Sequence, residues 1–413
     1  MFTIPENTNI TPKLAVKFIL RHAALNDRLD RLYSYYIGEH AILDRRTDKG
    51  ANNRLVCNHA KYITDCTTGY FLGSPVRYVS RTGKDISVIT DTLKRADSDT
   101  QDIDLARFGS IYGMSYEMLY IDAEGQIKLA SLDPRSAFVV YDDTVEQKPL
   151  FGVYYMPINS GDGYRSGYRV YLCDSFSITE FFTTTSFTIT KKNEPYEHFF
   201  GGVPIIEYYN NWDKQGDFEQ VTTLIDAYNT LQSDRVNDKE QFVDSLLVIK
   251  GQILGDTSEE QNDTFNAIKR YGVMTIDDTG DAKWLTRQFD ESSVDILRRS
   301  LESDIHKFSG VPCLSDESFS GNSSGVAIKY KLLAFEQMTK IKERYFTEGL
   351  KIRLSLIANA LDVLGYSKPD VGDIQIIYTH DLPENEAEIA KTVSLLKDVL
   401  PNDKLVKLLP YDV

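Results

Sequence analysis

Residues 221–248 read VTTLIDAYNTLQSDRVNDKEQFVDSLLV, and residues 291–308 read ESSVDILRRSLESDIHKF. Apolar residues recur in both segments every three or four positions, which is the period of a helix with one apolar face. The second segment has a narrow apolar stripe opposite its charged residues, a pattern typical of a helix that packs on another helix. We therefore expect an antiparallel helix pair, with residues 251–290 as a small insertion of mixed helix and strand at its tip.

The chain before this helix pair changes from a helical pattern to a strand pattern. Apolar residues have helical spacing over residues 11–37, 52–71 and 87–112. Between residues 115 and 211 the period becomes two, and β-branched and aromatic residues crowd the runs YEMLYI, QIKLASL, FVVY, YRVYL and SFTIT. The sequence thus predicts an α+β fold, with a helical first quarter and a β-rich part that begins near residue 115.

The chain after the helix pair contains a polar loop and a long helical stretch. Residues 315–325, SDESFSGNSSG, offer nothing that forms a core, and from the residues alone an ordinary surface loop is the favoured interpretation. Residues 326–364 contain no Pro and a single glycine, Gly349, which predicts a helix of about 60 Å with a bend at that glycine. A strand over residues 374–378 and a short amphipathic helix from Pro383 are expected to follow.

The composition is that of a folded, acidic protein. A chain of 413 residues with 42% hydrophobic residues is long enough for two or three compact units. The net charge of −15 argues against a protein whose whole surface grips nucleic acid, whereas an acidic wall would let DNA slide past. The four cysteines have no CxxC spacing, and the chain has neither a signal-peptide pattern nor a run of about 18 apolar residues. We expect a reducing, cytoplasmic compartment and no contact with a membrane.

Motifs that carry enzyme chemistry are missing. There is no Walker-type phosphate loop, no HExxH and no Cys or His pair at zinc spacing. Residues 321–325, GNSSG, are interpreted as a flexible linker in preference to a hydrolase elbow. We therefore expect no catalytic residue, no metal ligand and no cofactor. A nuclease would require clustered carboxylates that hold two metal ions, and no cluster has convincing spacing.

Five stretches of the sequence resemble the portal proteins of tailed double-stranded DNA bacteriophages, in the subfamily typical of long-tailed phages of Gram-positive hosts. They appear in family order and span most of the chain. They are YSYYIGEHAIL (Tyr33–Leu43), NNRLVCNHAKYITDCTTGYFLGSPV (Asn52–Val76), IYGMSYEMLYIDAEG (Ile111–Gly125), HFFGGVPIIEYYNN (His198–Asn211) and SGNSSGVAIKYKLLAFE (Ser320–Glu336).

The resemblance implies a portal-type subunit with an α/β wing, a helical stem pair, a small α/β clip, a long bent helix and a short helical crown. About twelve copies would form a closed ring with heterologous contacts. The implied domains are the wing at 1–218, with its β-rich part from about 115, the first stem helix at 219–250, the clip at 251–290, the second stem helix at 291–310, the tunnel loop at 311–325, the long bent helix and wing return at 326–382, and a crown-like helical region at 383–413. That last region is shorter than the resemblance leads us to expect.

The resemblance also assigns site residues. The tunnel loop would face DNA through Ser315, Asp316, Glu317, Ser318, Phe319, Ser320, Gly321, Asn322, Ser323 and Ser324. Its hydroxyl and amide groups would touch a moving phosphate backbone without reading sequence, and its two acidic residues would repel phosphate. The second stem helix carries the candidate stem charges Arg298, Arg299 and Glu302. The two arginines are interpreted as intersubunit ion-pair partners in preference to DNA contacts.

The implied function is a non-enzymatic ring channel for packaging and ejection of double-stranded DNA at a unique capsid vertex, assembled in the host cytoplasm. The implied partners are the terminase motor, the head-to-tail adaptor, and the major capsid and scaffolding proteins. Two alternatives remain: another structural virion protein, such as an adaptor or minor capsid component, or a DNA-processing nuclease.

Overall fold

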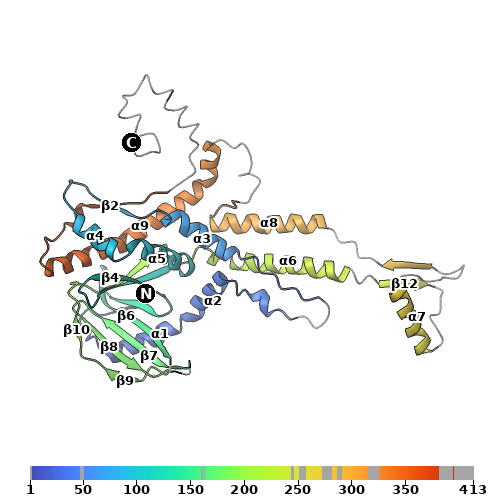
Figure 1. Cartoon of the computed structure of the whole chain (residues 1–413), viewed down its shortest axis with the longest axis horizontal. Coiled ribbons are helices and arrows are strands. Elements are labelled where there is room, and N and C mark those ends of the chain that lie inside the picture. The colour runs from blue at the N-terminus through green and yellow to red at the C-terminus, as the bar shows by residue number, and fades with distance from the viewer. Residues whose placement is uncertain are drawn as a thin grey trace. The chain divides into compact units, whose positions relative to one another are not determined.

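The computed structural model mixes helices and strands, with 48% of the chain helical and 22% in strands, so the expected α+β class is confirmed. It describes residues 2–46, 51–159, 161, 163–242, 246–250, 257–271, 281–285, 291–314, 325–380 and 394. The chain divides into two compact units (Figure 1). Unit 1 comprises Met1–Glu39, Asn58–Ile225 and Ser303–Val413, and unit 2 comprises His40–Cys57 and Asp226–Glu302.

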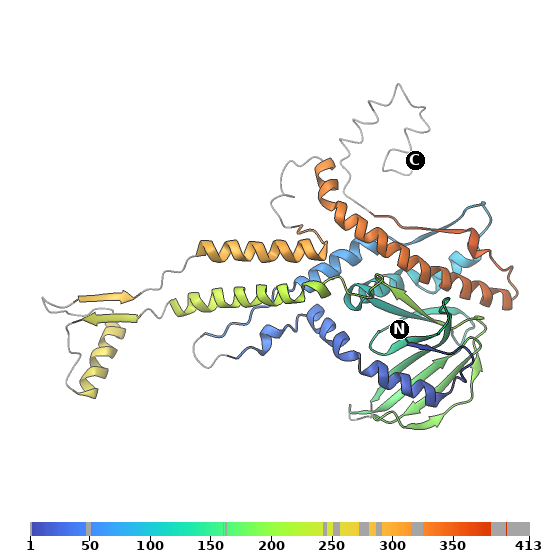
Figure 2. The ribbon, with the colours of Figure 1, turned by 180° about the vertical axis from the view of Figure 1, so that it is seen from behind.

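Unit 1 contains a seven-stranded sheet covered on one face by a helix. The strand order is β1-β5-β6-β7-β8-β10, with β9 paired to β8, and only the β1–β5 pair is parallel. Helix α1 (Pro12–Ala23) lies along the sheet in Figure 2 and buries Phe18 and Ile19 in a core shared with Phe151. The strands are β1 (Phe2–Ile4), β5 (Ala137–Asp142), β6 (Pro149–Asn159), β7 (Arg165–Cys173), β8 (Ser177–Thr183), β9 (Ile189–Lys192) and β10 (Tyr196–Glu197).

A second core in unit 1 lies between a three-stranded sheet and several helices. The sheet has the order β11-β3-β4, and a separate two-stranded sheet pairs β14 with β2. The long helix packs against β11, where an added Cβ at Gly349 would lie 2.3 Å from the ring of Tyr208. The elements are β2 (Arg77–Ser80), β3 (Met114–Ile121), β4 (Ile127–Leu132), β11 (Ile205–Tyr209), β14 (Ile374–Ile377), α3 (His59–Leu72), α4 (Ser87–Arg95), α5 (Ser98–Tyr112), α9 (Gly325–Val363), and the short 3-10 helices η2 (Glu219–Val221) and η3 (Val371–Asp373).

Two of the expected N-terminal helices are each divided into two. The stretch 11–37 forms α1 and α2 (Asn26–Ile37), with a break at Ala24 and Leu25. The stretch 87–112 forms α4 and α5, which are separated at Asp97, a residue with φ of 54°. A left-handed residue cannot continue an α-helix, so the helix has to restart after it.

The helix expected from residue 52 begins seven residues later. Asn58 caps α3, because its side chain accepts a hydrogen bond from the backbone N–H of Lys61 at 2.9 Å. Between α2 and that cap, the described residues form no helix apart from the 3-10 helix η1 (Ala41–Asp44). The prediction for residues 52–58 was therefore wrong.

Unit 2 contains the greater part of the two helices with which the sequence analysis began. They are α6 (Thr222–Phe242) and α8 (Glu291–Ser309), and Figure 1 shows them side by side. Between them along the chain come β12 (Leu246–Lys250), α7 (Ser258–Tyr271) and β13 (Asp281–Leu285), with β12 and β13 paired antiparallel. The expectation that the first helix extends to Val248 was wrong, because the aliphatic run LLVIK pairs as a strand.

Candidate functional site

The two long helices of unit 2 are joined by charged side chains. Arg235 and Lys239 of α6 both contact a carboxylate oxygen of Glu291, at 2.5 and 3.1 Å. The hydrogen bond from Arg235, followed by the one from Lys239, lowers the pKa of the Glu291 carboxyl group. Nearer the start of α6, Tyr228 hydrogen-bonds Arg298 of α8. Since later α6 residues meet earlier α8 residues, the helices run antiparallel.

The predicted stem charges pair with carboxylates of their own helix. Arg298 contacts Asp295 at 3.0 Å and Glu302 at 2.8 Å, and its side chain is only 22% exposed. Arg299 contacts Asp295 at 2.7 Å, yet its side chain is 73% exposed. Within one protomer, Arg298 and Glu302 therefore stabilise the helix, whereas Arg299 faces outward.

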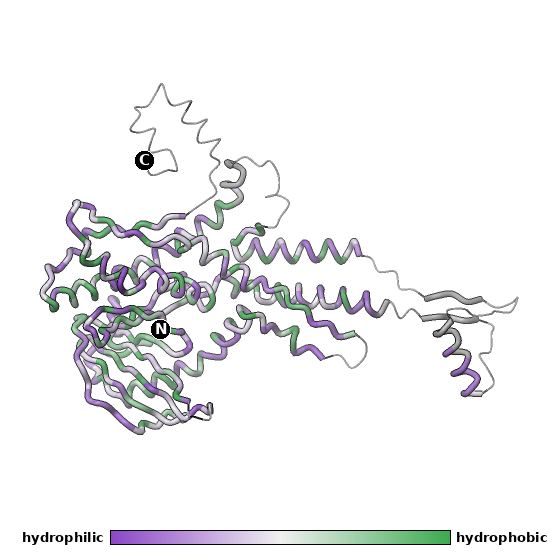
Figure 3. The backbone as a smooth tube through the Cα atoms, viewed as in Figure 1, coloured by the Kyte–Doolittle hydropathy of each residue, from purple (hydrophilic) through white to green (hydrophobic). Residues whose placement is uncertain are grey.

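The same helix leaves apolar side chains uncovered. Ile296 is 69% exposed and Leu297 is 51% exposed, and Figure 3 shows apolar and polar stretches alternating along α8. Contiguous exposed apolar surface is a feature of protein–protein contact sites. The helix pair thus presents an apolar patch beside a largely exposed arginine.

A ladder of polar bonds fixes residues 53–57 along α6. Asn229, Ser233 and Asn237 accept hydrogen bonds from the backbone N–H groups of Cys57, Leu55 and Asn53, at 2.8, 3.0 and 2.6 Å. Four residues of a helix span about 6 Å along the helix axis, and two residues of an extended segment span about 6.6 Å. Every fourth side chain of α6 can therefore lie opposite every second residue of the segment 53–57. Asn229 also hydrogen-bonds Nδ1 of His40.

The apolar period of the helix does not reveal this ladder. Asn229, Ser233 and Asn237 are all buried, although the polar face of this helix reads as a solvent-exposed one. The signal that identifies them is a short, uncharged polar residue repeated every four positions, which differs from the charged residues that line an exposed face.

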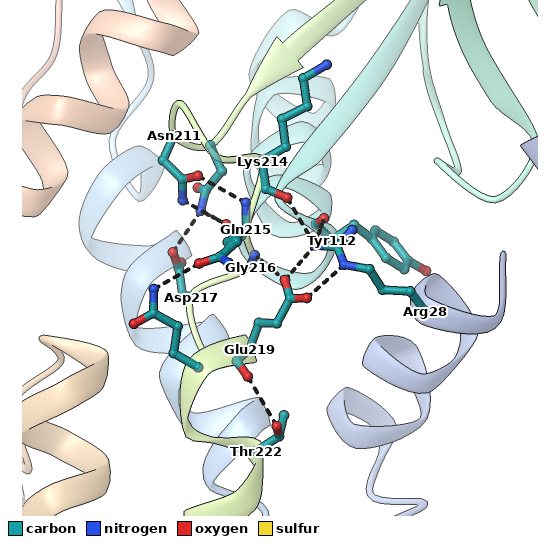
Figure 4. Close-up of polar contacts among 11 residues, drawn as sticks. Arg28, Tyr112, Asn211, Lys214, Gln215, Gly216, Asp217, Glu219 and Thr222 are labelled. Carbon is teal, nitrogen blue, oxygen red and sulfur yellow. Dashed lines mark hydrogen bonds and ion pairs between the residues drawn. The ribbon is translucent and has the colours of Figure 1, made fainter. Parts of the chain in front are cut away.

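The segment before α6 is held by the contacts drawn in Figure 4. Arg28 of α2 makes a forked pair with Glu219, with nitrogen to oxygen distances of 2.7 and 2.5 Å. The side chain of Asn211 makes two hydrogen bonds with the backbone of Gln215. Its amide nitrogen donates to the Gln215 carbonyl at 2.8 Å, and its amide oxygen accepts from the Gln215 N–H at 3.0 Å. Glu219 also accepts from the backbone N–H of Gly216 at 3.1 Å. A forked guanidinium–carboxylate pair is strong and directional, so this segment has a defined conformation.

Asp217 is the centre of a buried set of contacts in this segment. One carboxylate oxygen accepts from Ser110 at 2.6 Å and pairs with Lys342 of α9, while the other accepts from Asn210 at 2.9 Å. Lys342 is buried, and this burial lowers its pKa. The ion pair therefore ties α9 to the segment that leads into α6.

The predicted tunnel-loop residues 315–324 lie outside the described residues, but the chain just before them is well defined. The hydroxyl of Tyr62 donates to the carbonyl of Pro312 and accepts from the N–H of Leu314, both at 3.0 Å. Burial raises the pKa of Tyr62 to about 12. Gly310, with φ of 71°, follows α8, and an added Cβ there would lie 3.3 Å from the sulfur of Met338.

The described helices include none with the length and low charge needed to cross a bilayer. This finding concerns only those parts of the chain whose structure is described.

Comparison with known proteins gives relatives for nearly the whole chain. The family model described as phage portal protein, SPP1 Gp6-like, matches residues 17–411. The portal protein of Clostridium phage phiCD119 is 22% identical over 421 aligned positions, which cover 94% of this chain and 90% of that protein. The portal protein of Bacillus phage SPP1 is 22% identical over 410 positions, covering 92% and 77%.

Two solved structures also align with the chain. The neck of an empty gene transfer agent particle matches with a TM-score of 0.46 and 13% identity, and the virion of the native particle with 0.43 and 14%. Each alignment covers 86% of this chain and 90% of the other. The family match over residues 17–411 confirms the resemblance found in the sequence: the chain belongs to the SPP1 Gp6-like family of phage portal proteins, and it is a portal subunit of the head-to-tail connector.

Proposed function

We propose that about twelve copies of this subunit close into a ring whose channel passes double-stranded DNA during packaging and ejection. Membership of the portal family implies a homo-oligomeric ring in the phage head, and this observation carries the proposal. The ring is a structural conduit without catalytic activity.

The proposed domains follow the elements of the chain. Residues 219–242 and 291–310 form the proposed stem, and 311–325 the proposed tunnel loop. Because β12 (246–250) pairs with β13, it belongs with residues 251–290 in the proposed clip. Residues 1–218 and 326–382 form the wing, and 383–413 the crown. The antiparallel pair α6 and α8, with β12, α7 and β13 between them, supports the stem and clip assignment.

The apolar patch on α8 would be covered by a neighbouring copy in the ring. Ile296 and Leu297 supply the apolar area, and Arg299 supplies a charge that one protomer leaves largely exposed. This proposal keeps Arg299 as an intersubunit contact, whereas Arg298 and Glu302 act within their own helix. A closed ring needs such a patch to meet a different surface on the next copy.

The proposed partners are those that a connector needs. The clip would dock the terminase motor and later the head-to-tail adaptor, and the wing and crown would meet the major capsid and scaffolding proteins. The net charge of −15 suits a channel that repels phosphate and lets DNA slide without sequence readout. Assembly would take place in the host cytoplasm, before the ring is built into the capsid vertex.

Imaging and mass measurement of the purified full chain test this proposal. We expect negative-stain images of closed rings with an open centre, and a particle mass near twelve times 47.0 kDa. A chain that stays monomeric at every concentration would contradict the ring. Divalent-metal-dependent cleavage of plasmid DNA would instead favour the nuclease alternative.

A further inference from the structure

Three different kinds of metal ligand meet where α8 ends. A ring nitrogen of His306, the Sγ atom of Cys313 and a carboxylate oxygen of Glu302 all lie within 4.8 Å of one another. The three residues belong to one short stretch of chain, residues 302–313, which comprises the last turns of α8 and the turn that follows. Imidazole, thiolate and carboxylate groups are the ligands that zinc takes in proteins. The end of α8 therefore offers a mixed set of zinc ligands.

A hydrogen bond fixes which nitrogen of His306 can bind a metal ion. Nδ1 of His306 lies 3.0 Å from the backbone carbonyl oxygen of Val311. A carbonyl oxygen only accepts, so Nδ1 carries the proton and the neutral ring keeps its lone pair on Nε2. Metal-binding histidines are held by such a hydrogen bond from their other ring nitrogen. The rings of His59 and Tyr62 from α3 lie edge-on to the His306 ring, with centroid distances of 5.7 and 5.5 Å, and restrict its rotation.

The turn after α8 holds Cys313 in a defined position. Gly310 follows the helix with φ of 71°, the left-handed conformation in which helices often end. The residues on both sides of Cys313 contact the Tyr62 hydroxyl, which donates to the Pro312 carbonyl and accepts from the N–H of Leu314, each at 3.0 Å. The backbone at Cys313 is therefore ordered before any metal ion binds, and this reduces the entropy cost of binding.

Glu302 adds a ligand from the preceding turn of α8. It lies four residues before His306, so the two side chains share one face of the helix. The Glu302 carboxylate accepts a hydrogen bond from the Arg298 guanidinium at 2.8 Å, and a carboxylate has further lone pairs after one such bond. The charge of Arg298 opposes a nearby cation, but Arg298 also pairs with Asp295 at 3.0 Å, which balances that charge.

We propose that Glu302, His306 and Cys313 bind one zinc ion, with a water molecule as the fourth ligand. Tetrahedral zinc holds two ligand atoms about 3.5 Å apart, so the three side chains have to close by about 1 Å. The Cys313 thiol gives its proton to solvent on binding, because the thiolate is the ligand. The zinc ion then joins the last turns of α8 to the turn that follows, independently of the proposed channel function.

This proposal replaces the expectation that the chain has no metal ligand. That expectation was based on zinc motifs, in which cysteines and histidines recur in pairs at short spacings. Here a single cysteine follows a single histidine by seven residues, and the third ligand is a glutamate. The folded turn after α8 brings them together, which a search for paired spacings does not detect.

Zinc titration of the metal-free full-length protein tests the site. We expect calorimetry to give one zinc ion per chain, and zinc to raise the Tm of the wild type. Cys313→Ala should weaken zinc binding by at least about tenfold, because even the loss of an outer-shell partner costs that much. Cys173→Ala is the matched control, since Cys173 is buried in the core of the large sheet, and it should bind zinc like the wild type. Equal zinc binding by Cys313→Ala and the wild type would overturn the proposal.

Cobalt substitution identifies the ligands without relying on the folding of a variant. Co²⁺ bound to a thiolate has a charge-transfer band in the near ultraviolet, and tetrahedral coordination gives intense visible bands. We expect both signals in the wild type and in Cys173→Ala, and no near-ultraviolet band in Cys313→Ala. A wild-type spectrum of octahedral cobalt without the thiolate band would overturn the zinc site even if Cys313→Ala failed to fold. A chain that binds zinc but forms no rings would contradict the channel proposal alone.

Discussion

At the scale of single residues, burial decides which charges the fold tolerates. His22 of α1 is buried against the rings of Phe138 and Tyr155, and its Nδ1 lies 2.8 Å from the Tyr155 hydroxyl. This burial, outweighing the nearby carbonyl of Pro134, lowers the pKa of His22 to about 4. The neutral ring fits the core between α1 and the large sheet, whereas a charged ring would lose its hydration there, which is unfavourable.

The depressed pKa of His22 makes folding sensitive to acid. Between its ordinary value near 6.5 and about 4, the unfolded chain binds a proton that the folded chain does not, so stability falls as pH falls. We expect this residue to account for a loss of about 3 kcal/mol in the free energy of unfolding across that window. The measurement is urea unfolding at neutral pH and at about pH 4.5, compared between wild type and His22→Gln.

The His22→Gln variant supplies the control, because a glutamine side chain cannot titrate. Its stability should change less with pH than that of the wild type, although it starts from a lower value. Parallel pH profiles for the two proteins would show that His22 is not the acid-sensitive group.

At the scale of secondary-structure elements, two helical glycines should respond oppositely to the same change. Gly349 of α9 faces the ring of Tyr208, and a Cβ there would lie 2.3 Å from it, whereas a Cβ at Gly69 of α3 would meet nothing within 4 Å. Gly→Ala in an open helix position stabilises by about 1 kcal/mol. We therefore expect Gly69→Ala to raise stability by about that amount, and Gly349→Ala to lower it by about 1–3 kcal/mol through overpacking.

Chemical denaturation of the two variants checks this pair. A gain in stability from Gly349→Ala would mean that α9 can move away from β11. The bend expected at Gly349 stays a prediction, and the close approach of Tyr208 gives a separate reason for a glycine at this position.

The polar ladder on α6 gives a second prediction at this scale. Asn229→Ala removes the acceptor for the N–H of Cys57 and the contact with His40, and Asn229 is buried. We expect a loss of about 1–3 kcal/mol in urea unfolding, because a buried backbone N–H is left without its partner. Thr230→Ala, one position along on the exposed face, should change stability by less than about 0.5 kcal/mol. Similar losses for both variants would argue against the ladder.

The sequence predicts those elements whose apolar pattern extends along the whole element. The apolar period located α8, α9 and β3, because in each it runs through the whole element. It could not locate the break at Asp97, since one left-handed residue leaves the spacing on both sides intact. The polar ladder on α6 could not be predicted from local patterns either, because Cys57 and its partner Asn229 are 172 residues apart in the sequence. Of the predicted site, the charges on α8 are described, and the loop residues 315–324 remain a prediction.

At the scale of the whole assembly, the exposed patch on α8 should control ring formation. Ile296→Asp places a charge where a neighbouring copy is proposed to pack, and burying an unpaired carboxylate is strongly unfavourable. We expect this variant to fold with unchanged Tm but to lose most of its rings in mass photometry. Val145→Asp, at a fully exposed position in the turn between β5 and β6, is the control and should assemble normally.

The loop at residues 315–324 should matter for DNA and not for assembly. Its composition offers no core-forming set of side chains, and the contacts of Tyr62 hold the chain before it. Removing residues 318–323 therefore leaves every described contact of the helix pair and of Tyr62 in place. We expect deletion particles to form rings of wild-type mass and enter capsids, yet to package little or no DNA, because the ring lacks the polar segment proposed to touch the moving duplex. The measurement is nuclease-protected DNA per capsid beside ring mass for the same variant. If the rings themselves failed to form, the loop would belong to the subunit interface, and if packaging stayed normal, the channel would have to be lined by other residues.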